Sequence, residues 1–290
     1  MNSNRLLPTL AVALSGCLWG SMGLFVRTLN QWGLASMQIV EIRSILTVVM
    51  LGLFLLLFGR EQLRPRLRDL PIYAACGVFS VVFFNFCYFS TIQLLSLSAA
   101  AILLYTAPIF VMLLSALLFK ERITRRKIAA ILLAFVGCAL VSGILGGIPM
   151  TTAGLLLGLG SGIGYALYSI FSRAALERGC NTLTITFWTF AFAALGGLLL
   201  TDFSQITTVL SDGGAKLFVF LLLYALVTTV APYLLYTWGL GRMENSRAAV
   251  IASIEPVVAT LLGILVFQES LTLSGGAGVL LVLAALLILR

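Results

Sequence analysis

The sequence predicts an all-α integral membrane protein whose ten transmembrane helices form two inverted five-helix repeats. Composition, the length of the apolar runs and an internal repeat lead to this fold class. Of the 290 residues, 61% are hydrophobic and 10% are charged, whereas a soluble domain carries about 25% charged residues. Because 18 basic and 10 acidic side chains are too few to form a polar shell around so much apolar surface, we expect lipid to surround the chain. The composition excludes a soluble enzyme, a nucleic-acid-binding domain and a disordered linker.

Ten apolar runs with short connections follow one another along the chain, and a helix needs about 20 such residues to cross a membrane. Backbone groups in lipid must be satisfied within each segment, so runs of this length indicate helices and not barrel strands. A lipoprotein signal ending at Cys17 is a weaker alternative for the first run, which continues without a break to Val26. The predicted helices occupy residues 7–28, 36–58, 70–92, 97–119, 127–145, 152–172, 182–201, 215–239, 247–267 and 272–289.

Basic residues fall almost entirely on one side of the predicted bundle. If the N-terminus is cytoplasmic, only Arg27, Arg43 and Lys216 of the 18 Lys and Arg residues lie at or near the outer side. The positive-inside rule then predicts that both termini are cytoplasmic and that the number of spans is even. We expect a multi-pass protein of the bacterial inner membrane. Its +8 net charge is then explained by its orientation in the membrane and does not indicate nucleic-acid binding.

Several kinds of catalytic and metal site are excluded by what the sequence lacks. It contains no histidine, so a Ser-His-Asp triad, a histidine-bound metal and an imidazole proton relay cannot form. The five cysteines stand singly, which indicates neither a disulfide framework nor a soft-metal site. No Walker motif is present. We expect a protein that is not an enzyme and holds no metal or cofactor.

The second half of the chain repeats the first. Residues 98–124 recur as residues 246–272, with 10 of 27 positions identical, and Pro108 recurs 148 residues later as Pro256. Several of the identical positions are polar or proline, which apolar composition alone would not produce. The predicted repeats are residues 1–148 and residues 149–290.

Because each repeat holds an odd number of helices, the two copies must enter the membrane in opposite directions. Inverted repeats are a recurring architecture of secondary transporters, in which the substrate site lies near the midplane where the repeats meet. The repeat therefore predicts a transporter that works by alternating access around a midplane cavity. A membrane receptor or scaffold without transport is the alternative from another functional class.

The segment from Tyr105 to Thr124 and its copy from Glu255 to Thr272 resemble the drug/metabolite transporter superfamily, in its ten-helix EamA-like branch. The Leu18–Gly20 step and Arg43 fit the same pattern. The resemblance implies a monomeric secondary transporter, often an exporter of amino acids or related metabolites, with its fifth and tenth helices more peripheral. The cargo itself does not follow from it, and organic cations and amines are the alternative substrates.

Glu255 is the one acidic residue at the centre of a predicted span, and a charge there costs from about 3 to more than 10 kcal/mol. We expect it to face a polar cavity as a proton site or a substrate-ammonium site; a structural hydrogen bond is the alternative. Its counterpart in the first repeat is Ala107. Pro108 and Pro256 interrupt matched helices, which indicates hinges or cavity-lining breaks near the site, or else simple packed kinks.

Arg43 lies about 10 Å along its helix from the outer end, at about 1.5 Å per residue. Glu41 is two residues away and therefore on another face of the helix. Arg43 is predicted either to hold a substrate carboxylate or to extend to the outer interface.

Rings with a polar group suit a small amphipathic solute or a cation, although such residues also populate interfacial belts and packed interiors. Trp19 matches Tyr165 in the repeat, and Tyr88 matches Tyr236. With Arg43 and Glu255, the candidate substrate-binding residues are Trp19, Asn85, Tyr88, Tyr105, Tyr165, Tyr168, Tyr236 and Trp238, with Tyr233 as a further aromatic.

Small residues predict close helix packing. Gly16, Gly20 and Gly23 share one face of the first predicted helix, and glycines also crowd residues 158–164 of the sixth. The glycines of residues 158–164 do not form a dinucleotide-binding loop, because no strand precedes them and their spacing is wrong.

Overall fold

The computed structural model describes residues 3–143, 151–270 and 272–288, and these ranges contain helices and no strand. The predicted repeat boundary between residues 148 and 149 lies outside them. The α-helices are α1 (Ser3–Gly20), α2 (Met22–Gln31), α3 (Ser36–Phe58), α4 (Leu70–Gly77), α5 (Phe84–Leu94), α6 (Leu97–Leu104), α7 (Ala107–Phe119), α8 (Arg125–Val141), α9 (Thr152–Glu177), α10 (Thr182–Gly197), α11 (Phe203–Ala225), α12 (Ala231–Leu240), α13 (Asn245–Ala252), α14 (Glu255–Phe267) and α15 (Leu273–Ile288).

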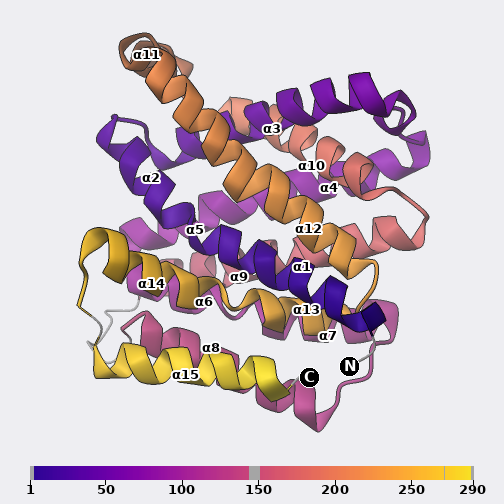
Figure 1. The fold of residues 1–290 in the computed structure, drawn as a ribbon, viewed down its shortest axis with the longest axis vertical. Coiled ribbons are helices and arrows are strands. Elements are labelled where there is room, and N and C mark those ends of the chain that lie inside the picture. The colour runs from indigo at the N-terminus through magenta and orange to yellow at the C-terminus, as the bar shows by residue number, and fades with distance from the viewer. Residues whose placement is uncertain (1–2, 144–150, 271, 289–290) are drawn as a thin grey trace.

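Short helical turns join some of these helices into longer runs. They are the 3-10 turns η1 (Arg60–Leu63), η2 (Leu67–Asp69) and η5 (Leu198–Leu200), and the π-helical turns η3 (Val78–Phe83) and η6 (Leu226–Val230). The start of α1 and the end of α15 lie on the same side of the bundle (Figure 1). This placement agrees with an even number of crossings.

Within the described residues, eight helical segments are long and apolar enough to cross a membrane, and α15 is a shorter apolar helix. The remaining predicted span, residues 127–145, corresponds to α8, which has 17 residues and begins with three basic ones. The predicted all-helical membrane fold is therefore confirmed. The eight segments are Leu6–Gln31, Ser36–Phe58, Leu67–Leu94, Leu97–Phe119, Thr152–Glu177, Thr182–Leu200, Phe203–Leu240 and Asn245–Phe267.

The predicted helix at residues 215–239 begins earlier in the structure, at Phe203. The polar first part of α11 carries no apolar signal, yet the Asp202 carboxylate caps it by accepting hydrogen bonds from the backbone nitrogen (2.9 Å) and hydroxyl (2.7 Å) of Ser204. Gly214, with φ 54° and ψ −152°, then separates this part from the apolar remainder.

The internal repeat is visible in the irregular parts of the backbone. The π-helical turn η3 recurs 148 residues later as η6, and the break between α6 and α7 recurs as the break between α13 and α14. α7 and α14 both end on a left-handed residue, Lys120 (φ 57°) and Gln268 (φ 54°), which for non-glycine residues is uncommon. Two copies of one sequence pattern therefore adopt the same local conformations.

Glycines bring helices from the two repeats into contact. A side chain at Gly20 would lie 2.6 Å from the carbonyl oxygen of Glu255, and one at Gly16 would lie 2.8 Å from that of Ala252, so α1 packs on α13 and α14. The prediction for Gly23 is wrong, because nothing lies within 4 Å of the place where its side chain would be. α8 and α15 pack along each other at one edge of the bundle (Figure 1), as the resemblance implies for the fifth and tenth helices.

Candidate functional site

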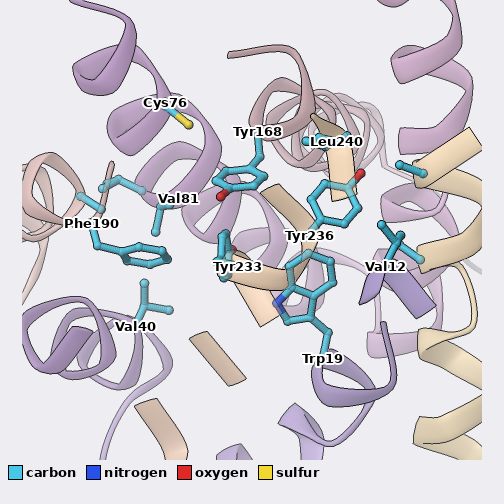
Figure 2. Packing of buried hydrophobic residues seen from close by; sticks show 14 of the residues in the cluster. Val12, Trp19, Val40, Cys76, Val81, Tyr168, Phe190, Tyr233, Tyr236 and Leu240 are labelled. Atoms are coloured by element: carbon cyan, nitrogen blue, oxygen red, sulfur yellow. The ribbon is translucent and has the colours of Figure 1, made fainter. Parts of the chain in front are cut away.

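Four aromatic side chains from three helices meet in one buried cluster (Figure 2). The Trp19 ring contacts the rings of Tyr233 and Tyr236, each at 5.2 Å between centroids. Tyr168 meets Tyr233 edge to face at 4.7 Å. All four side chains are buried, and edge-to-face pairs at these distances are favourable packing arrangements. Trp19, Tyr168, Tyr233 and Tyr236 are called the aromatic layer below.

Two tyrosine hydroxyls of the aromatic layer are held by residues that the sequence reasoning missed. Tyr168 Oη and Thr237 Oγ1 are 2.6 Å apart, and Tyr236 Oη and Ser169 Oγ are 2.8 Å apart. Small hydroxyl residues inside apolar helices carry no sequence signal of this kind, because they are as often bonded to their own helix backbone. The hydroxyls of Tyr168 and Tyr236 are thus both paired inside the protein.

The cavity beside the aromatic layer has a volume of about 10 Å³, which is room for about one water molecule. Ser80 and Tyr165 complete its lining together with the layer and Ser169. Aromatic side chains therefore fill almost all of the predicted midplane chamber here. A solute cannot occupy this space unless the rings move.

Glu255 begins α14 and is half-buried. Its carboxylate accepts a hydrogen bond from the hydroxyl of Tyr165 at 3.3 Å, and the Tyr165 ring contacts Trp19 at 6.2 Å between centroids. No Lys or Arg among the described side chains lies within 4 Å of this carboxylate. Position in the first turn of a helix favours a negative charge there, but no cation neutralises it.

Tyr88 and Tyr105 are half-buried and lie within electrostatic range of Glu255. Tyr88 also packs on Phe84, with 6.1 Å between ring centroids, and Phe84 packs on Tyr165 at 5.6 Å. The structure therefore groups Tyr88, Tyr105 and Tyr165 around Glu255, next to the aromatic layer.

Pro108 and Pro256 each occupy the second residue of a helix that restarts after a break, in α7 and α14 respectively. Proline is well tolerated there because the first backbone N–H groups of a helix have no intrahelical partner. The predicted interruptions are real, and the break in the second repeat places Glu255 at a helix start. Whether they act as hinges stays a prediction.

Arg43 does not extend to the outer interface, which excludes that alternative. Its side chain is 1% exposed, and its guanidinium donates to Asn85 Oδ1 at 3.4 Å and contacts Met22 Sδ at 3.6 Å. Its Nε has no hydrogen-bond partner. Glu41 points elsewhere, into the space that a side chain at Gly197 would need, as its different helix face predicts.

Trp238 lies apart from the other candidates. The Arg242 guanidinium stacks on its ring at 3.9 Å from the centroid. Both residues line an open groove of about 840 Å³ formed with Leu10, Leu14 and Leu235. This larger hollow is on the outside of the bundle, where lipid covers apolar side chains, and Glu255 does not line it.

Residues 6–143 and 152–290 each match the EamA-like transporter family. A transporter of Archaeoglobus fulgidus, named uncharacterized, is 30% identical over 285 residues, covering 96% of this chain and 94% of the relative. A Salmonella typhimurium protein named "Probable amino-acid metabolite efflux pump" is 29% identical over 196 residues, covering 65% and 66%.

A solved crystal structure superimposes with a TM-score of 0.79 at 21% sequence identity, covering 98% of this chain and 96% of the other. This likeness shows the fold of a multi-pass helical membrane protein. The family match and the Archaeoglobus relative place the chain in the transporter class and not among enzymes. The chain belongs to the EamA-like transporter family, within the drug/metabolite transporter superfamily, and holds two EamA domains.

Proposed function

We propose that this transporter is a secondary active exporter of small metabolites, amino acids or related compounds, which works by alternating access around Glu255. It functions as a monomer in a bacterial plasma membrane with both termini cytoplasmic. The printed name of the Salmonella relative supports metabolite export. The arrangement around Glu255 supports a cargo that carries an ammonium group, or coupling to a proton.

The observation that carries this proposal is a half-buried carboxylate without a basic partner. The titratable groups in electrostatic range of Glu255 are Tyr88, Tyr105, Tyr165, Tyr233 and Cys138. None of them supplies a positive charge at neutral pH. Because a buried carboxylate is costly unless neutralised, a proton or a substrate ammonium is the partner that offsets its desolvation.

A second candidate cargo, an organic cation or amine, is favoured by the aromatic rings around Glu255. No Lys or Arg among the described side chains lies within 4 Å of the Glu255 carboxylate, and the guanidinium of Arg43 is bonded to Asn85. Aromatic faces attract cations, so rings and an unpaired carboxylate together suit a cationic ligand.

The test begins with purified protein and a thermal-shift screen of amino acids, amines and quaternary ammonium compounds, because a ligand that binds the folded state raises its melting temperature. Ligands that raise it are then tested for exchange in proteoliposomes at several external pH values. We expect exchange of ammonium-bearing solutes, lost in Glu255→Gln and retained in Glu61→Gln, which alters an exposed carboxylate in η1.

The outcomes separate the alternatives. Exchange of amino acids but not of simple amines supports the metabolite exporter, and the reverse supports the cation carrier. Binding without exchange of any solute supports a receptor and contradicts the proposal. A pH dependence that is unchanged in Glu255→Gln, with exchange retained, removes Glu255 as the proton site.

A further inference from the structure

Two carboxylates occupy equivalent positions in the two repeats but have different partners. Glu121 and Glu269 each follow a left-handed residue, 148 residues apart. Glu121 accepts hydrogen bonds from the backbone nitrogen of Asn245 (2.6 Å) and from Ser246 Oγ (2.6 Å), and so caps the start of α13. Glu269 instead forms an ion pair with Arg27 at 2.7 Å, and both side chains are about half-exposed.

These contacts define the two ends of the bundle. The Glu121 end holds the α7–α8 and α12–α13 connections, and the Glu269 end holds the α5–α6 and α14–α15 connections. α13 packs along α7, whereas among the described helices its counterpart α6 has no packing of this extent on the counterpart of α7, α14. The aromatic layer also lies between Glu255 and the Glu121 end. We call the capping of a helix start by the matched glutamate a latch. In this structure the latch is formed at the Glu121 end, where Glu121 caps α13, and not at the Glu269 end, where Glu269 pairs with Arg27.

Two matched arginines show the same difference. Arg173 donates to the carbonyl oxygens of Leu240 (2.9 Å) and Met243 (3.2 Å), which ties α9 to the end of α12 at the Glu121 end. Arg27, its counterpart in the first repeat, makes no such bond to the end of α5 and holds Glu269 instead.

We infer that Glu121 and Glu269 are alternate latches of the transport cycle. In the opposite state, Glu269 caps the start of α6 as Glu121 caps α13 here, and Arg27 moves to the carbonyl groups at the end of α5. Glu121 leaves α13 and pairs with Arg173. The residue needed to receive Glu269 is present, because Ser98 is the counterpart of Ser246, and its hydroxyl has no hydrogen-bond partner within the described part of the chain.

The two latches differ in strength. Lys127 Nζ lies 3.6 Å from Glu121 and 3.0 Å from Glu244, and Lys127 is only 9% exposed. The counterparts of Lys127 and Glu244 are Gly275 and Ser96, so the Glu269 end lacks this ion pair. The state latched at the Glu121 end is therefore the resting state, in agreement with the structure.

This inference rests on the proposed alternating access, but hydrogen–deuterium exchange of the intact protein without substrate tests it separately. In Glu121→Ala we expect exchange at the start of α13 to be faster by about ten- to a hundredfold, since a hydrogen bond to a charged group contributes about 1.5–3 kcal/mol and about 1.4 kcal/mol is tenfold. Loss of a cap alone predicts that change too. The latch further predicts slower exchange at the start of α6, at the opposite end.

The double variant Glu121→Ala with Glu269→Ala provides the decisive comparison. It keeps the fast exchange at α13 and loses the added protection at α6, whereas Glu61→Ala, at the same end as Glu121, changes neither. If Glu121→Ala does not fold, Lys127→Ala gives the same pattern with smaller changes. Exchange that rises at α13 while α6 is unaffected in every variant means that Glu121 is only a fixed cap, and it overturns the inference even if transport is intact.

Discussion

Trp19 and Tyr165 occupy equivalent positions in the two repeats, and their rings meet edge to face with centroids 6.2 Å apart. Equivalent residues of two copies come into contact only close to the axis that relates the copies. Tyr165 also donates its hydroxyl hydrogen to Glu255. The Glu255 carboxylate is therefore hydrogen-bonded to a residue at the contact between the two repeats. A movement of one repeat against the other changes the surroundings of this carboxylate directly.

Replacing Tyr165 by Phe removes the hydrogen bond to Glu255 and keeps the ring. We expect the affinity for an ammonium-bearing ligand to fall by up to about tenfold, because a hydrogen bond to a charged group contributes about 1.5–3 kcal/mol and the observed 3.3 Å is long. Titration by thermal shift measures it. Tyr73→Phe, in a separate cluster around Ala175 and Ile185, is the control, and equal affinities in both variants would contradict the role of Tyr165.

Gly20 and Gly23 form a matched pair for testing the contact between the repeats. An added methyl group at Gly20 would lie 2.6 Å from the Glu255 carbonyl oxygen, whereas at Gly23 nothing lies within 4 Å. We expect Gly20→Ala to destabilise the protein by about 1–3 kcal/mol. Gly23→Ala should be neutral or stabilising by up to about 1 kcal/mol, because alanine favours the helix. Thermal unfolding in detergent measures both, and similar melting temperatures would refute the close approach of α1 and α14.

Arg43 and Asn85 should be energetically coupled. Asn85→Ala removes one oxygen acceptor of the buried guanidinium, and we expect the free energy of unfolding to fall by about 1–3 kcal/mol. Arg43→Met combined with Asn85→Ala should be more stable than Asn85→Ala alone, because no unpaired charge is left in the interior. Additive changes in a double-mutant cycle of melting temperatures would show that the two side chains do not interact.

The cap of α11 predicts a pH dependence outside the membrane-spanning segments. Hydrogen bonds from the side chain and the backbone of Ser204 lower the pKa of Asp202 below its usual 3.8. A pKa that is lower in the folded state means that the stabilising contribution is present above the unfolded-state value and is lost as the pH falls through the folded-state value. The difference in melting temperature between the wild type and Asp202→Ala should therefore be constant from neutral pH to about pH 5 and shrink below about pH 4. A difference that grows in acid would contradict the cap.

Most of the fold follows from the sequence because lipid imposes simple requirements on length and polarity. The start of the eighth span does not, since its polar first turns are stabilised by the Asp202 cap and carry no apolar signal. The repeat follows from polar identities such as Glu121 and Glu269. The positions of the repeat boundary and of the membrane sides stay predictions.

The candidate site was only partly predictable. Glu255 stands out because a carboxylate in an apolar run is costly, and Arg43 stands out for the same reason. Aromatic residues carry no such signal, because a ring faces the interior or lipid at similar cost. Trp238 consequently lies on the outside with Arg242, whereas Tyr233, which packs on Tyr168 in the aromatic layer, has no sequence feature that distinguishes it from its neighbours.

Access to Glu255 from the two faces of the membrane tests the central claim most directly. The native cysteines are replaced, a single cysteine is placed at Glu255, and the protein is reconstituted in liposomes. A parallel sample with its single cysteine at Arg125 is labelled to determine the orientation in the liposomes. A membrane-impermeant, positively charged thiol reagent is then applied from each side. We predict reaction mainly from the Glu269 end, and a shift of reactivity to the Glu121 end when Glu121→Ala is added. Reaction from one end alone in both proteins, unaffected by Glu121→Ala, would contradict alternating access around this residue.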